Sequence, residues 1–113
     1  MTLKLAKVAG CKVILTSSSD SKLDTIRNLP GLGPISTINY ANNIEWDTEA
    51  VKINGGHGVD IVIENGGTPS LLQSIKATAK RGIISQVGYL GQQNPQDLDR
   101  LLSRLIEKTI TLR

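Results

Sequence analysis

Several kinds of residue are scarce in this chain of 113 residues: it has one cysteine, one histidine, one tryptophan, two tyrosines and no phenylalanine. The single Cys11 excludes an intrachain disulfide and fits a reducing compartment. One cysteine and one histidine do not make a credible set of zinc ligands. With so few aromatic side chains, the core must be built from valine, isoleucine, leucine and alanine, as buried parallel strands usually are.

Long apolar runs and a strong charge of either sign are also missing. No run approaches the roughly 20 apolar residues of a membrane span, and the N-terminus lacks the segment order of a secretory signal, so we expect a cytoplasmic protein outside the membrane. The formal net charge is +3, with basic and acidic residues interspersed. This balance predicts no nucleic-acid surface, although a mild basic bias favours an anionic small-molecule ligand.

What the chain does contain is a regular alternation of short β-branched runs with helical patterns, over a length that suits one domain, residues 1–113. The segments predicted as strands are residues 11–16, 35–39, 59–63, 82–87 and 109–112. The segments predicted as helices are residues 2–9, 20–28 and 46–53, one that opens at Thr68-Pro69 and one that opens at Asn94-Pro95. This alternation is typical of βα units, so we expect an open, doubly wound parallel sheet of the Rossmann type.

Local patterns refine these elements. Ser19 is predicted to cap helix 20–28, and Thr68 to cap the helix in which Pro69 is the first residue. The apolar face of that second helix is predicted to be Leu71, Leu72, Ile75 and Ala79. The apolar positions of the last helix are Leu98, Leu101, Leu102, Leu105 and Ile106. The run of residues 59–63, VDIVI, is predicted to be a strongly buried strand.

In an open parallel sheet, ligands bind at the carboxyl ends of the strands. Those ends are polar or glycine-rich here: residues 16–19, 39–40, 64–67 and 87–89. Ser17 to Ser19 precede a predicted helix, whose free N–H groups and positive end suit an anion, and Lys22 adds charge in the first turn. The same residues also fit a plain helix cap beside a solvated lysine, so both interpretations stay open.

Three further parts of the sequence bear on its chemistry. Glu64 directly follows strand 59–63. It fits either a residue that contacts a ligand or a structural carboxylate whose hydrogen bonds are made within the protein. His57 lies in Gly-Gly-His-Gly, which predicts an exposed turn. The Gly31-Leu32-Gly33 segment is not a dinucleotide fingerprint, because it follows a helix and has Ser36 where the third glycine should be.

Four segments follow one another in a characteristic order. They are residues 5–23, Ile38-Asn39-Tyr40, the span 55–67 with GGHGVD and VIENGG, and residues 82–88, GIISQVG. This order resembles the cofactor-binding domain of zinc-type alcohol dehydrogenase-like and quinone oxidoreductase-like proteins of the medium-chain dehydrogenase/reductase superfamily. Each segment alone is a weak signal. All of them in register over nearly the whole chain make the resemblance specific.

The resemblance implies an NAD(P) cofactor and favours NADP(H) over NAD(H). Ser17, with Ser18 beside it, stands where NAD-preferring members carry an acidic ribose-binding residue, so a 2′-phosphate would not be repelled. Lys22 and Tyr40 match positions that contact this phosphate in quinone oxidoreductase-like relatives. The other contacts that the resemblance implies are Asn65 and Gly66 beside the adenine or a cofactor ribose, and Val87, Gly88 and Tyr89 beside the nicotinamide.

The resemblance also implies an incomplete domain. Complete members have a catalytic domain, a first Rossmann strand and a glycine-rich pyrophosphate loop, for which this sequence shows no counterpart. Without that central strand, strands 11–16 and 59–63 face a gap, and an unpaired buried edge is costly. We expect either direct pairing of these two strands or a homodimer that covers them, the third alternative being a marginal fragment.

Fold alone does not give function, so three functions stay open. The first is the NAD(P)-binding domain, or a remnant of it, of an oxidoreductase, which alone would not be competent for hydride transfer. The second is a small cofactor-independent isomerase, cyclase or lyase of secondary metabolism, with Glu64, Tyr89 and His57 as the nearby acid or base candidates. The third is a non-catalytic interaction protein.

Overall fold

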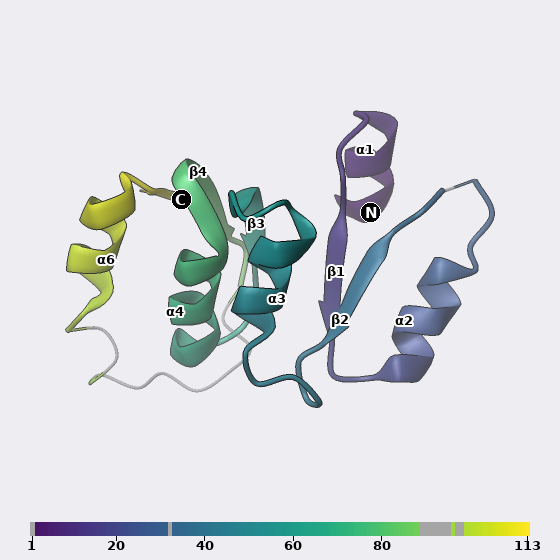
Figure 1. Cartoon of the computed structure of the whole chain (residues 1–113), viewed down its shortest axis with the longest axis horizontal. Coiled ribbons are helices and arrows are strands. Elements are labelled where there is room, and N and C mark those ends of the chain that lie inside the picture. Colours follow the sequence, from purple (N-terminus) through teal and green to yellow (C-terminus); the bar gives the residue numbers. More distant parts are fainter. Residues whose placement is uncertain (1, 32, 89–95, 97–98) are drawn as a thin grey trace. The chain divides into compact units, whose positions relative to one another are not determined.

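In the computed structural model, helices alternate with strands along the chain (Figure 1). The structure describes residues 2–31, 33–88, 96 and 99–113. The helices are α1 (Thr2–Val8), α2 (Asp20–Arg27), α3 (Trp46–Ile53), α4 (Thr68–Ala77) and α6 (Leu101–Lys108), and the strands are β1 (Ile14–Ser17), β2 (Ser36–Asn39), β3 (Val59–Glu64), β4 (Thr78–Gln86) and β5 (Thr111–Leu112). Every ladder between these strands is parallel, which confirms the predicted α/β class. None of the helices in these ranges has the length and apolar content needed to cross a membrane.

The chain forms two compact units, Met1–Trp46 and Asp47–Arg113, and each has its own sheet. In the first unit β1 pairs with β2, and in the second unit the strand order is β3-β4-β5. The expected direct pairing of strands 11–16 and 59–63 is therefore wrong for the strands described. Each sheet is instead stabilised by helices of its own unit, α2 on β1 and β2, and α4 and α6 on the second sheet. The expected homodimer stays a prediction.

Two local sequence signals set helix boundaries in the first unit: Gly10 ends α1 and Ser19 begins α2. Gly10 adopts a φ of +80° after α1, and the N–H groups of Gly10 and Cys11 donate to the carbonyls of Lys7 and Ala6 at 3.1 and 3.0 Å. This is the hydrogen-bond pattern of a glycine-terminated helix. Ser19 caps α2 as predicted, with its hydroxyl accepting from the Lys22 N–H.

The core of the second unit lies on one face of its sheet, under α4 and α6 (Figure 1). Ile84 of β4 is completely buried and packs with Leu71 and Ile75 of α4. The partly buried residues around this cluster are Val62, Leu101, Leu105 and Ile110. Leu71 and Ile75 confirm two positions of the predicted apolar face, and their spacing of four residues places both on the same side of the helix.

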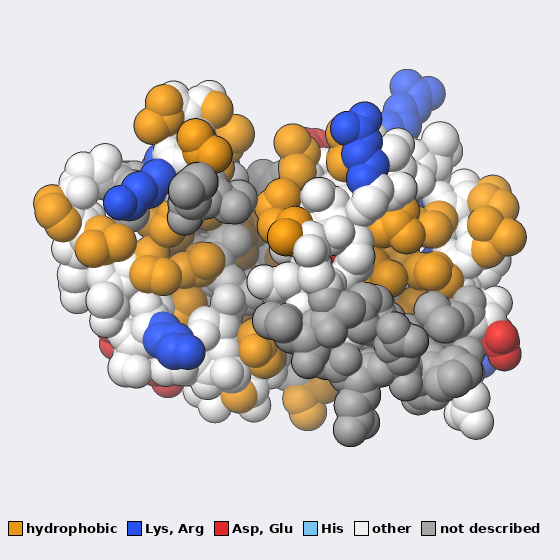
Figure 2. Space-filling model, turned by 180° about the vertical axis from the view of Figure 1, so that it is seen from behind, with side chains coloured by type: hydrophobic (Ala, Val, Ile, Leu, Met, Phe, Trp, Pro, Cys, Tyr) orange, Lys and Arg blue, Asp and Glu red, His pale blue; other side chains and the backbone are white. Residues whose placement is uncertain are grey.

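Within the described residues of this unit, the opposite side of β3 is largely exposed, so the prediction of a strongly buried strand is wrong. Ile61 and Ile63 are 59% and 47% exposed, whereas Glu64 at the end of the strand is buried. Alternate residues of a strand point to opposite faces, and among the described residues the helices α4 and α6 pack on the face that carries Val62. Seen from behind, hydrophobic side chains reach the molecular surface (Figure 2).

Helix α4 differs from its prediction at both ends. Its N-cap is Gly67 and Thr68 is already helical, because the extended backbone lies one residue earlier than expected. The helix ends at Ala77, so Ala79 belongs to β4 and not to the apolar face of α4. β4 starts earlier than predicted, but its regular ladder with β3 begins at Ile83, after an irregular stretch in which Arg81 has a φ of +65°.

Lys108 of α6 stabilises the C-terminal end of α4. Its Nζ donates to the carbonyl oxygens of Ile75, Lys76 and Thr78 at 3.1, 2.8 and 2.9 Å. A cation at the negative end of a helix is favourable, and the Ile75 carbonyl also accepts from the N–H of the C-cap Thr78. Partial burial lowers the pKa of Lys108, and the nearby Asp47 carboxylate opposes this effect.

The last predicted helix is confirmed as α6, with an asymmetric packing. Leu101 and Leu105 contact the core, whereas Leu102 and Ile106 are 68% and 67% exposed. The predicted Asn94-Pro95 start and Leu98 lie outside the described residues.

Candidate functional site

The candidate site of the first unit lies at the carboxyl ends of β1 and β2, where two turns meet. β1 ends at Ser17 and β2 ends at Asn39, and these two residues are paired in the ladder. The Tyr40 N–H donates to the Ser17 carbonyl at 3.1 Å, so the pairing continues one residue beyond β2. The ladder thereby brings Ser17 and Tyr40 together, as expected for residues at the carboxyl ends of neighbouring parallel strands.

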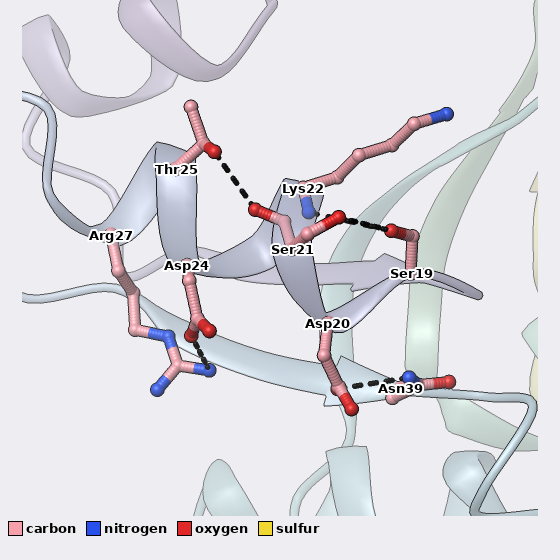
Figure 3. A network of polar contacts seen from close by, with 8 residues as sticks. All are labelled: Ser19, Asp20, Ser21, Lys22, Asp24, Thr25, Arg27 and Asn39. Atoms are coloured by element: carbon pink, nitrogen blue, oxygen red, sulfur yellow. Dashed lines mark hydrogen bonds and ion pairs between the residues drawn. The ribbon is translucent and has the colours of Figure 1, made fainter.

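The serine turn, residues 17–19, is held by its own hydroxyl groups (Figure 3). The Ser17 hydroxyl accepts from the Ser19 N–H at 3.2 Å. The Ser19 hydroxyl accepts from the Lys22 N–H at 3.4 Å and lies 2.9 Å from the Ser21 hydroxyl. The capping interpretation is therefore confirmed. Ser18 and Lys22 are exposed, so an anion contact by these residues stays a prediction.

A second connection between the two turns, from Asp20 to Asn39, did not follow from the sequence. The Asn39 side-chain amide donates to Asp20 Oδ1 at 2.9 Å, and the Asn39 Oδ1 accepts from the Ala41 N–H at 2.9 Å. Asn39 thus joins the first turn of α2 to the turn that carries Tyr40. In Figure 3, Asp20 points toward Asn39, while the Lys22 side chain extends away from both. The sequence signal that could have indicated this hydrogen bond is an aspartate, Asp20, directly after the serine cap, together with an asparagine, Asn39, at the end of the next strand.

Substitutions of Asp20 and Asn39 test whether the hydrogen bond between their side chains stabilises the turn. In Asn39→Asp, two carboxylates face each other, and we expect the unfolding free energy to fall by about 1 kcal/mol because like charges repel and a hydrogen bond is lost. The double variant Asp20→Asn/Asn39→Asp has the net charge of the wild type and again pairs one amide donor with one carboxylate acceptor. It should therefore recover most of the lost unfolding free energy. Urea denaturation followed by circular dichroism measures both. A double variant no more stable than Asn39→Asp would contradict the pairing.

The candidate site of the second unit is the glycine turn, residues 65–67, at the end of β3. Glu64, the last residue of β3, is 5% exposed, and its carboxylate accepts from the Gly66 N–H at 2.7 Å and from the hydroxyls of Ser70 and Ser74. Of the two interpretations of Glu64, the satisfied structural carboxylate is thus the observed one. Asn65 is exposed and Gly66 is partly buried.

The end of β4 lies next to this turn. The Val87 N–H donates to the Glu64 carbonyl at 2.8 Å, and the Gln86 side-chain amide donates to the Gly88 carbonyl. Val87 is 69% exposed, so its side chain is accessible to a ligand. The predicted Tyr89 lies outside the described residues.

Neither of two surface hollows is formed by the predicted cofactor residues. One of about 360 Å³ lies by α1 and is lined by Lys4, Lys7 and Pro30, among others. The other, of about 220 Å³, is lined by His57, Lys76 and Lys80, together with further residues of the second unit. His57 is exposed, as its glycine-rich surroundings predicted. Within the described ranges, no group of three or more His, Cys, Asp or Glu residues could hold a metal ion.

Comparison with known proteins identifies the chain. The family model for the zinc-binding dehydrogenases matches residues 1–113. The chain belongs to the zinc-binding dehydrogenase family. It corresponds to the NAD(P)-binding domain of these medium-chain dehydrogenases, which confirms the resemblance seen in the sequence. The described residues do not supply the zinc ligands that the family description implies.

Similar proteins support the same assignment. The chain is 36% identical over 112 residues to a zinc-type alcohol dehydrogenase-like protein of Schizosaccharomyces pombe, covering 98% of this chain and 32% of that protein. Among solved structures, a 2-haloacrylate reductase is 28% identical with a TM-score of 0.83, covering 100% of this chain and 34% of the other. An NAD-dependent alcohol dehydrogenase is 27% identical with a TM-score of 0.82, covering 97% and 30%. The chain thus spans about a third of the length of these relatives, and its incomplete Rossmann-type fold is confirmed.

Proposed function

We propose that this NAD(P)-binding domain prefers NADP(H) and that it does not transfer hydride by itself. The observation that carries the preference is the end of β1, where Ser17, and not an acidic residue, pairs with Asn39 at the predicted ribose position. A carboxylate at this point would repel a 2′-phosphate, whereas hydroxyl groups and a nearby lysine can bind it. One similar structure is that of an NAD-dependent enzyme, so the proposal rests on the residues of this chain.

The nearest acid in the first unit does not contradict this preference. Asp20 follows the serine turn directly, but its carboxylate accepts the Asn39 amide. Lys22 extends in another direction, away from this pair (Figure 3). Its ammonium group is therefore not neutralised by Asp20 and is available to an anionic ligand beside Ser18 and Ser19. Hydride transfer needs a substrate site, which relatives three times as long would hold outside this domain.

Titration calorimetry with NADPH and NADH tests the proposal. We expect NADPH to bind more tightly, and Lys22→Ala to weaken NADPH by about five- to tenfold, the value of one charge-assisted contact, with little effect on NADH. Lys4→Ala is the matched control, since Lys4 is an exposed lysine of α1 in the same unit. Equal binding of the two cofactors, or equal losses in both lysine variants, would contradict the preference. No heat at millimolar NADPH would contradict cofactor binding altogether.

A further inference from the structure

Glu64 is a buried acid that the proposed function does not use. Burying a carboxylate is costly unless donors surround it, and Glu64 is 5% exposed with donors on both oxygens. Oε1 accepts from the Gly66 N–H at 2.7 Å and from the Ser70 hydroxyl at 3.0 Å, and Oε2 accepts from the Ser74 hydroxyl. Ser70 and Ser74 lie one turn apart on α4, so both hydroxyls reach the same carboxylate.

Through its contacts Glu64 connects the glycine turn, α4 and the end of β4. The side chain of Glu64 joins the glycine turn to the first turns of α4, where a negative charge is also favoured by the helix dipole. Its main-chain carbonyl accepts from the Val87 N–H at 2.8 Å and so joins the end of β3 to the residue after β4. The N-cap Gly67 makes no side-chain cap, and Glu64 anchors this end of α4 to the turn through Ser70 and Ser74.

The same carboxylate explains why residue 66 is a glycine. A Cβ on Gly66 would lie 2.8 Å from Ser70 Cβ and 2.9 Å from Glu64 Oε1, closer than real Cβ atoms approach other atoms. The Gly66 N–H already points at Glu64 and is not free to donate to a ligand. The exposed group of the glycine turn is therefore Asn65.

We propose that Glu64 is a positioning residue, which holds the glycine turn so that Asn65, and not the Gly66 amide, is presented to the cofactor. This inference rests on the proposed function, because it assumes that the turn contacts NADP(H). It assigns to Gly66 a steric role in place of the direct contact that the resemblance implied.

The test compares two substitutions of Glu64. Gln keeps an oxygen that can accept the Gly66 N–H, whereas Leu has a similar size and no acceptor. We expect Glu64→Leu to weaken NADPH binding by about tenfold in calorimetry, and Glu64→Gln to stay within about threefold of the wild type. Amide hydrogen exchange at Gly66, measured by NMR, should be faster in Glu64→Leu alone. Lys108→Met is the matched control, since it removes hydrogen bonds at the opposite end of α4 and should leave NADPH binding unchanged.

The outcomes separate this inference from the proposed function. Wild-type chain that takes up no NADPH overturns the proposed function, and with it the cofactor role of the turn, before any variant is measured. Wild-type binding together with a folded Glu64→Leu that binds NADPH normally overturns the positioning role alone, as does an equal loss in Glu64→Gln and Glu64→Leu. Where Glu64→Leu does not fold, Gly66→Ala replaces it, because it displaces the turn with the carboxylate intact. Unchanged binding in that variant overturns the inference.

Discussion

Replacing Gly58 by alanine is expected to lower the free energy of unfolding by roughly 2–5 kcal/mol, because two costs combine at this position. Gly58 is buried and has a φ of +83°, a conformation that alanine adopts only with strain. A Cβ there would also lie 2.8 Å from the Ala79 nitrogen and 2.9 Å from the Ala77 oxygen. Both are main-chain atoms at the junction of α4 and β4, so neither can move aside as a side chain could.

Gly56 provides a matched control two residues earlier in the same turn. Its φ is +88°, yet a Cβ would meet no atom within 4 Å. Gly56→Ala therefore carries the conformational cost alone, about 1 kcal/mol. Urea denaturation, with hydrogen exchange of the β4 amides as the readout specific to the second unit, measures both variants. Equal losses for the two glycines would show that the close approach at Gly58 does not limit stability.

The second large effect is expected for Ile84→Ala, with a loss of roughly 2–5 kcal/mol in unfolding free energy. Ile84 is 0% exposed and lies at the centre of the cluster with Leu71 and Ile75. Truncation removes buried methyl and methylene groups and leaves a cavity that the surrounding helices can fill only in part. The same denaturation and exchange measurements apply.

The control for this variant is Ile61→Ala, on the neighbouring strand β3. Ile61 is 59% exposed, so the same change of side chain should cost less than about 1 kcal/mol. A loss as large as that of Ile84→Ala would mean that the outer face of β3 is covered in solution. A dependence of that loss on protein concentration would then support the predicted homodimer.

The sequence predicted those features that depend on neighbouring residues. Helix α3 has the predicted bounds of 46–53, and Ser19 caps α2, because caps and apolar periodicity act within one or two turns of helix. Parallel strands followed from the alternation of short strand and helix patterns. The order of short motifs over the chain identified the family, which the match over residues 1–113 confirms.

The positions of the predicted site residues followed only in part. The ladder register brings Ser17 next to Asn39 and Tyr40, as sharing one sheet edge requires. Asp20 was not among the predicted residues, because its partner Asn39 is 19 residues away and only the register places the two together. The role of Glu64 stayed open for the same reason, since its donors Ser70 and Ser74 are brought to it by the packing of α4.

The sequence by itself therefore determined the class of fold, most helix bounds, the family and, to within one residue, where strands β1 to β4 end. The tertiary structure decided which apolar residues are buried, which acids have partners and which glycines cannot be replaced. The physical reason is that the alternation of residues in a strand such as β3 shows which side chains share a face, but a face is buried only if another element covers it. Ile61 and Ile84 look alike in sequence, and only the position of α4 and α6 makes one exposed and the other the centre of the core.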